Sequence, residues 1–281
     1  MQRTLVIPLA LAALACQSTR SPAWRAVDGR SGNVVSFERM ADELSKMDVV
    51  FLGEVHDNEI GHELQLAMTR ALHERVGRVA VSLEMIERDC QLDLDLYLSG
   101  RIDEADFVER SRPWTNYYRD YRPVVELARR EGLPVIAGNV PRALARRVAR
   151  AGLGDVAREL LAPREVLPEP GPYRERFEAV MGGHGGMQDA VMDRVFASQV
   201  IKDEAMAESI ADHLERAPGT LVVHWVGRFH SDHHLGTVEC LRRRIPGLRV
   251  GVVSMLPGTR NPRKITPEQR SAGDFLWLVR N

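Results

Sequence analysis

The chain has 281 residues, a formal net charge of −1 and 44% hydrophobic residues. This length and apolar content suffice for one large or two small domains with a full hydrophobic core, which excludes a disordered chain and a small disulfide-stapled scaffold. The basic residues are spread along the sequence, so the charge pattern indicates no nucleic-acid partner.

The amino terminus has the pattern of a bacterial export signal. Arg3 precedes an apolar run over residues 5–15, which is too short to span a membrane. The segment Ala13-Leu14-Ala15-Cys16 is similar to a lipobox, whose cysteine is lipidated, although Ala13 stands where leucine is usual. We therefore expect residues 1–16 to be a lipoprotein signal peptide with Cys16 as the lipidated residue. Simple cleavage without lipid is the alternative.

Residues 17–33 are polar and contain Pro22 and Gly29, a composition that favours a linker between a membrane anchor and a folded domain. From residue 34 onwards, short apolar runs alternate with segments of helical periodicity. We expect a single domain over residues 34–281. Its strands are predicted at residues 34–36, 49–52, 79–83, 134–137, 220–226, 249–256 and 275–279.

Apolar residues recur at helical spacing between these runs, which predicts helices over residues 37–46, 58–74, 91–98 and 103–110. Strands that alternate with helices are typical of an α/β fold, here a mostly parallel sheet flanked by helices. Two longer helical excursions, about residues 86–133 and 141–218, separate consecutive strands. We expect them to form a helical cap over the carboxyl edge of the strands, with Trp114–Tyr121 as an aromatic loop in the first.

Four of the apolar runs end in residues that are costly to bury without a purpose. The residues at these four ends, in chain order, are Glu54 with His56, then Glu84, Asn139 and His230. In open α/β sheets, ligands bind where parallel strands end, because the loops that leave the strands form a crevice there. The sequence therefore predicts a shared site at this edge.

Two kinds of chemistry suit the site. Glu54, His56, Glu84 and His230 can bind a divalent metal that keeps an open position for water. The same residues can instead be catalytic without a metal, one carboxylate orienting a histidine that acts as general base. Each histidine taken alone is also compatible with an ordinary satisfied polar residue. The sequence has neither a Gly-rich phosphate loop after the first long strand nor a Gly-x-Ser-x-Gly elbow, which argues against a nucleotide and a serine nucleophile.

The cap contributes weaker candidates. One is an aromatic cluster that comprises Trp114, Tyr117, Tyr118 and Tyr121. The cluster could line a flat apolar ligand, with a tyrosine oxygen as an iron ligand as in some haem proteins. Alternatively, it could only pack the interior of the cap. His184 lies between glycines and is interpreted as a lid ligand or a surface residue. Arg122 and Arg142 suit bidentate pairing with a carboxylate of the ligand or of the protein.

Several segments together resemble the ChaN family of haem-binding lipoproteins, in a superfamily with the Tiki and TraB proteins and the erythromycin esterases. They are residues 51–58 with His62 and Gln65, 83–85, 121–123, 139–142, 182–184, and Gln199 with Asp203 and 206–207. The resemblance implies an α/β fold and anchoring in the outer membrane of a Gram-negative cell. It also implies haem held in a homodimer through a tyrosine ligand with histidine assistance. For the wider superfamily it implies a metal-dependent hydrolase site at Glu54, His56, Glu84 and His230.

The last motif departs from the family pattern, because Gly227-Arg228-Phe229-His230 leads into two further histidines and no tyrosine. Tyr121, in the matching Tyr-Arg-Pro segment, is therefore the first candidate haem ligand and Tyr118 the second. The remaining expected cofactor contacts are His184, Arg122, Asn139 and Arg142.

The sequence thus predicts an exported haem-binding lipoprotein associated with iron uptake, periplasmic or anchored in the outer membrane. The alternatives are a metal-dependent hydrolase and a lipid-anchored interaction module.

Overall fold

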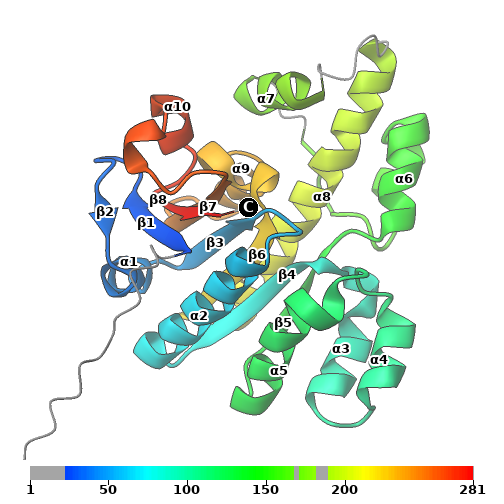
Figure 1. Cartoon of the computed structure of the whole chain (residues 1–281). Helices are drawn as coiled ribbons and strands as arrows, with labels where there is room; N and C mark the ends of the chain where they lie inside the picture. The colour runs from blue at the N-terminus through cyan, green and yellow to red at the C-terminus, as the bar shows by residue number, and fades with distance from the viewer. Residues whose placement is uncertain (1–22, 168–170, 182–188, 281) are drawn as a thin grey trace, which may run out of the picture.

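The computed structural model describes residues 23–167, 171–181 and 189–280. Its centre is an eight-stranded sheet with the strand order β2-β1-β8-β7-β3-β6-β4-β5 (Figure 1). Six strands run parallel, namely β3 (Val49–Glu54), β4 (Val79–Glu87), β5 (Val135–Asn139), β6 (Leu221–Gly227), β7 (Val250–Pro257) and β8 (Phe275–Val279). Helices flank the sheet, which confirms the predicted α/β fold. In these described ranges, no helix has the length and apolarity needed to cross a bilayer.

Strand β1 (Trp24–Asp28) lies inside the range 17–33 that the sequence analysis treats as a linker, and this part of the prediction is wrong. The strand pairs antiparallel with β8 along its whole length and with β2 (Val34–Val35) on its other side. Val27 is completely buried among apolar residues of β7 and β8. The short run is interrupted by charged residues, and its pairing partner lies at the far end of the chain, so local periodicity could not reveal it.

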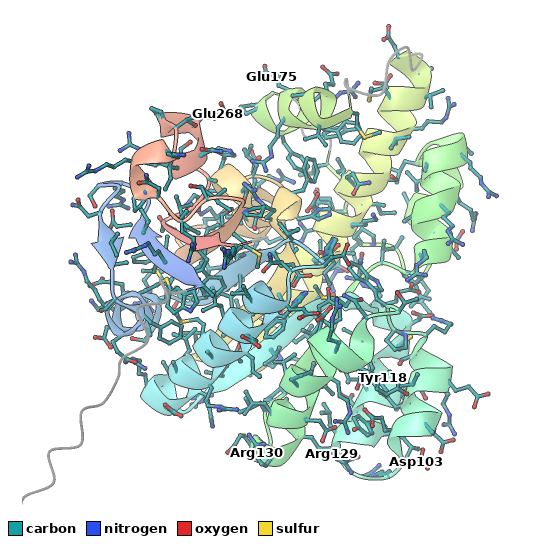
Figure 2. All side chains as sticks on the ribbon, viewed as in Figure 1. Asp103, Tyr118, Arg129, Arg130, Glu175 and Glu268 are labelled. Carbon is teal, nitrogen blue, oxygen red and sulfur yellow. The ribbon has the colours of Figure 1, made fainter. Side chains whose placement is uncertain are left out.

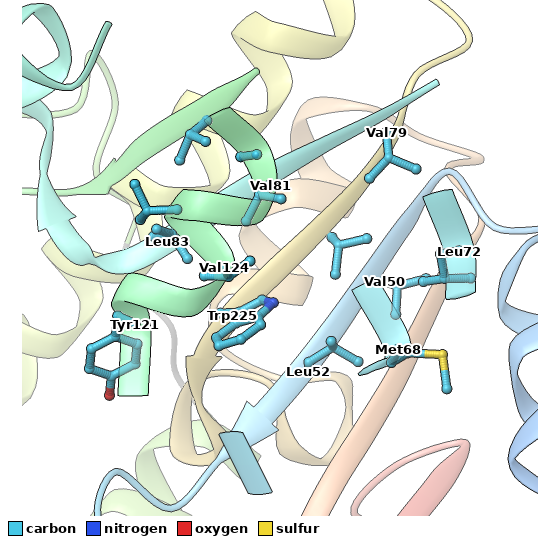
Figure 3. Packing of buried hydrophobic residues seen from close by; sticks show 14 of the residues in the cluster. Val50, Leu52, Met68, Leu72, Val79, Val81, Leu83, Tyr121, Val124 and Trp225 are labelled. Atoms are coloured by element: carbon cyan, nitrogen blue, oxygen red, sulfur yellow. The ribbon is translucent and has the colours of Figure 1, made fainter. Parts of the chain in front are cut away.

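Alternate residues of the central strands pack on opposite faces of the sheet. On one face, Val50 and Leu52 contact a core built with α1 (Phe37–Leu44), α2 (Glu59–Val76) and α5 (Arg122–Glu131) (Figure 3). On the other, Val49 and Phe51 pack with α8 (Asp189–Arg216) and α9 (Thr237–Arg244). This period of two places Glu54 at the end of a strand that is buried on both faces.

Helix α2 shows how the local sequence sets the start of the crossover after β3. The side chain of Asn58 accepts a hydrogen bond from the Gly61 N–H at 2.9 Å and caps the helix. Gly77, with a φ of 74°, ends the helix in the left-handed conformation that glycine adopts without steric cost. Between β3 and α2 only four residues remain, so His56 is held close to the strand end.

The first excursion contains η1 (Arg88–Cys90), α3 (Gln91–Leu98), α4 (Glu104–Ser111), η2 (Tyr117–Tyr121) and α5. The second contains α6 (Arg142–Ala151), η3 (Gly154–Arg158), α7 (Pro172–Met181) and α8. In Figure 1, α7 lies beyond the carboxyl ends of the strands, whereas α3 and α4 lie beside β5. Residues Tyr117–Tyr121, expected as a loop, form a π-helical turn that runs directly into α5. The remaining short elements are η5 (Arg228–His230), η6 (Asp232–His234), η7 (Pro262–Lys264) and α10 (Pro267–Arg270).

Candidate functional site at the carboxyl edge of the sheet

The structure brings the predicted strand-end residues to one edge, because β3, β6, β4 and β5 are consecutive neighbours in the sheet. Glu54 pairs in register with Gly227 at the end of β6. Glu54, Glu84 and His230 are all at least nine-tenths buried, whereas the His56 side chain is 44% exposed. At this edge the His56 imidazole is therefore accessible, whereas Glu54, Glu84 and His230 are buried.

Glu54 is the anchor of this set and accepts hydrogen bonds from three side chains. Its Oε1 lies 2.8 Å from His56 Nδ1 and 2.7 Å from the Tyr121 hydroxyl, and its Oε2 accepts from Gln65 Nε2 at 2.9 Å. Because a carboxylate only accepts, the neutral form of His56 carries its proton on Nδ1 and has Nε2 as an acceptor. Burial lowers the pKa of His56, but the hydrogen bond to Glu54 and the negative charge of Glu84 outweigh it, so the pKa is raised overall.

Tyr121 is buried at the edge of the core, with its hydroxyl pointing away from the apolar cluster (Figure 3). Burial, followed by the charge of Glu54, raises the pKa of this phenol far above its ordinary value. The hydroxyl therefore stays protonated and committed to Glu54. In this structure the Tyr121 hydroxyl holds Glu54, a role that the sequence alone does not indicate.

A second histidine–carboxylate pair lies across the edge. His230 Nδ1 is 2.8 Å from Asp203 Oδ1 of α8, and its Nε2 is 3.8 Å from Glu84 Oε1. Asp203 also accepts hydrogen bonds from the hydroxyls of Thr237 and Tyr173, both at 2.6 Å. The family motif is the only sequence signal that points to Asp203. The contacts of Thr237 and Tyr173 carry no sequence signal, since both partners are far away along the chain.

Glu84 lies between the two pairs. Its Oε2 accepts a hydrogen bond from the Gly227 N–H at 2.6 Å. Burial raises the pKa of Glu84, but the charges of His230 and His56 and this N–H outweigh it and leave the pKa lowered. A Cβ atom added to Gly227 would lie 2.8 Å from His56 Cε1, so glycine at this position lets the imidazole approach the end of β6 closely.

The metal prediction for Glu54, His56, Glu84 and His230 is not supported. Within the described part of the chain, no group of three or more His, Cys, Asp or Glu side chains is arranged to hold a metal ion. The physical reason lies in the hydrogen bonds of Glu54, whose two oxygens already accept from three donors. What remains is an acid–base network.

The other predicted residues are dispersed. Asn139 joins the site, because its Nδ2 donates to the Glu84 carbonyl at 3.1 Å. Arg142, half exposed, has its Nε 3.6 Å from Glu87 Oε1. Arg122 instead pairs with Glu104 of α4 at 2.6 Å, which is the structural ion pair that the sequence analysis left open. Tyr118 is 59% exposed at the molecular surface near α4 (Figure 2). His184 and Cys16 lie outside the described residues.

A cavity of about 200 Å³ adjoins the edge and shares Glu84 with it. Its walls come from β4, β5, α6 and α8 and from the segment that carries Trp114. The Trp114 ring meets the ring of His56 edge to face at a centroid distance of 4.7 Å. The accessible imidazole and the cavity are therefore neighbours on the same side of the sheet edge.

Comparisons with known proteins agree with this architecture. The family model "haem-binding uptake, Tiki superfamily, ChaN" matches residues 40–241. Among solved structures, that of cofacial haem binding to ChaN of Campylobacter jejuni superposes with a TM-score of 0.71 at 19% identity, covering 92% of this chain and 97% of that one. A protein from Bacillus cereus gives a TM-score of 0.50 at 12% identity, with coverage of 91% and 95%. A search of curated proteins found no match.

Proposed function

Because the chain belongs to the ChaN family of haem-binding uptake proteins in the Tiki superfamily, we propose that it binds haem. The observation that carries this proposal is the match over residues 40–241, which includes both helical excursions and all four strand ends of the site. An iron ligand must offer a donor atom that the fold does not already use. Tyr118, exposed at the surface, meets this requirement, whereas the Tyr121 hydroxyl is held by Glu54.

Tyrosine supplies an oxygen ligand to ferric haem iron. We therefore propose that Tyr118 would hold the haem iron and that Tyr121 is a structural residue. Titration of the purified protein with haemin, followed at the Soret band, is expected to show a shifted spectrum and weaker binding for Tyr118→Phe. Tyr121→Phe, which removes a hydroxyl from the same aromatic segment, serves as the matched control and should leave the Soret position unchanged. A spectrum altered by Tyr121→Phe alone would overturn the assignment.

The same proposal extends to where the protein acts. An exported protein anchored through Cys16, in the outer membrane or periplasmic, would hold haem for iron uptake, and a homodimer could enclose it. Incorporation of a labelled fatty acid that disappears in Cys16→Ser is the expected result. Sedimentation with and without haemin measures the oligomeric state, and a haem-independent monomer would contradict the dimer.

A second candidate function rests on the two histidine–carboxylate pairs on either side of Glu84. Glu54 orients His56 so that Nε2 can take a proton from a water molecule that attacks an ester, and His230, oriented by Asp203, stands opposite as a proton donor. Haem binding alone does not require this arrangement. A screen of chromogenic esters with chelator-treated protein tests it, with His56→Gln expected to abolish any turnover. Equal rates in the wild type and His56→Gln would reject it.

A further inference from the structure

The cavity beside Glu84 carries a feature that the acid–base network does not use. Asn139 lines it and is only 8% exposed, and its Nδ2 donates to the Glu84 carbonyl, which fixes the orientation of the amide. Its Oδ1 is buried and has no hydrogen-bond partner among the described residues. A buried acceptor without a partner is unfavourable, and a ligand with an N–H or O–H group would supply the missing donor.

Three cations line the same cavity. Arg142 and Arg146 line the cavity from α6 and are four residues apart, so they lie on one face of the helix. Lys202 lines it from α8 and lies close enough to lower the pKa of Glu84. Within the described ranges, Arg146 has no ion pair, and Arg142 has only the 3.6 Å contact with Glu87. The two carboxylates of the lining, Glu84 and Glu87, therefore face three cations.

The amino terminus of α6 adds to this positive character. The residue before the helix is Pro141, whose side chain makes no capping hydrogen bond, and the first N–H that bonds back to it is that of Leu144. The N–H groups of Arg142 and Ala143 thus have no acceptor within the helix, and the helix dipole favours a negative charge there. Together with the arginines, this end of the helix suits a carboxylate.

We propose that this cavity binds a small carboxylate that also carries a hydrogen-bond donor, such as an N-acylated amino acid. The carboxylate pairs with Arg142, Arg146 and Lys202, the donor is accepted by Asn139 Oδ1, and the Trp114 ring covers an apolar part. The volume of about 200 Å³ lies below the range of roughly 300–1,000 Å³ for drug-sized ligands, which restricts the occupant to a small molecule. The inference goes beyond haem binding and does not depend on it.

Two probes of matched shape test the proposal on the full chain by ligand-observed NMR titration. N-Acetylglycine has the carboxylate and the N–H, and levulinate is the same skeleton with CH₂ in place of N–H. We expect N-acetylglycine to bind about tenfold more tightly than levulinate, because only N-acetylglycine has an N–H group that can donate to the buried Asn139 Oδ1. Equal affinities for the two probes would overturn the role of Asn139.

Neighbouring arginines on α6 provide the matched variants. Arg146→Gln is expected to weaken N-acetylglycine binding about tenfold. Arg147→Gln removes the same charge from a side chain that instead pairs with Glu159, and it should bind as the wild type does. The same loss in both variants, or in neither, would contradict the site. Displacement of N-acetylglycine by haemin would assign the cavity to a haem propionate and would also overturn the proposal, whereas binding to haemin-saturated protein supports it.

Discussion

At the scale of single residues, Glu54 connects the core of the protein to its accessible histidine. Its three donors come from the following loop, from α2 and from η2, so one side chain fixes His56, Gln65 and Tyr121 together. Each donor would be left without an acceptor if the carboxylate were lost, and a buried group without its partner costs about 1–3 kcal/mol. Glu54 is thus both a structural centre and the residue that sets the tautomer of His56.

Glu54→Gln tests this role. The glutamine amide has one acceptor oxygen for three donors, and its NH₂ group would face at least one of these donors. We therefore expect the free energy of unfolding in urea to fall by about 1–3 kcal/mol. Glu59→Gln is the control, because Glu59 is 66% exposed and pairs only with the surface residue Arg119. Equal unfolding midpoints for the two variants would show that the Glu54 network contributes no stability.

The pH dependence of His230 follows from its partners. Burial lowers the pKa of His230, but Asp203 and Glu84 outweigh it and raise the pKa above its ordinary value. A histidine of this kind adds stability that is complete below its unfolded pKa of about 6.5 and is lost as the pH rises through the folded pKa. Asp203→Asn should lower the pKa of His230 measured by NMR and flatten the fall of stability above about pH 6.5.

Asp193→Asn, an exposed position on the same helix, is the control for this titration. It should leave the pKa of His230 as in the wild type. A wild-type pKa at or below about 6.5, unchanged by Asp203→Asn, would contradict the electrostatic account of this pair.

At the scale of elements, the strand ends could be predicted from sequence, whereas the contacts between the excursions and the edge could not. Short apolar runs that end in Glu54, Glu84 and Asn139 identify buried parallel strands and their carboxyl ends. The hydroxyl of Tyr121 reaches Glu54 across 67 residues, and Tyr173 reaches His230 across 57. Such contacts depend on how helices pack over the edge, which periodicity does not encode.

The structural role of strand β1 could not be predicted from the sequence. It covers the edge of β8, and Val27 fills a cluster with Leu256, Leu276 and Leu278. We expect deletion of residues 1–28 to lower the thermal unfolding temperature sharply, because it exposes this cluster and the backbone edge of β8. Deletion of residues 1–22 keeps the strand and is the control. The same melting temperature for both proteins, measured by circular dichroism, would contradict a structural role for β1.

At the scale of the whole molecule, two features lie on the same fold. Family membership indicates haem, while the sheet edge holds a buried acid–base network with a basic cavity beside it. The fold class and the convergence of Glu54, His56, Glu84 and His230 could be anticipated from the sequence. The choice between Tyr118 and Tyr121 could not, because both lie in one aromatic segment and only tertiary packing makes one buried and the other exposed.

Haem binding is the central claim, and an equilibrium titration of the wild-type protein with haemin tests it most directly. We expect a Soret band distinct from that of free haemin, which grows to saturation at a fixed ratio of haemin to protein. The same saturation should persist in His56→Gln, since the assigned ligand is Tyr118. Absorbance that rises linearly without saturation, with the spectrum of free haemin throughout, would contradict it.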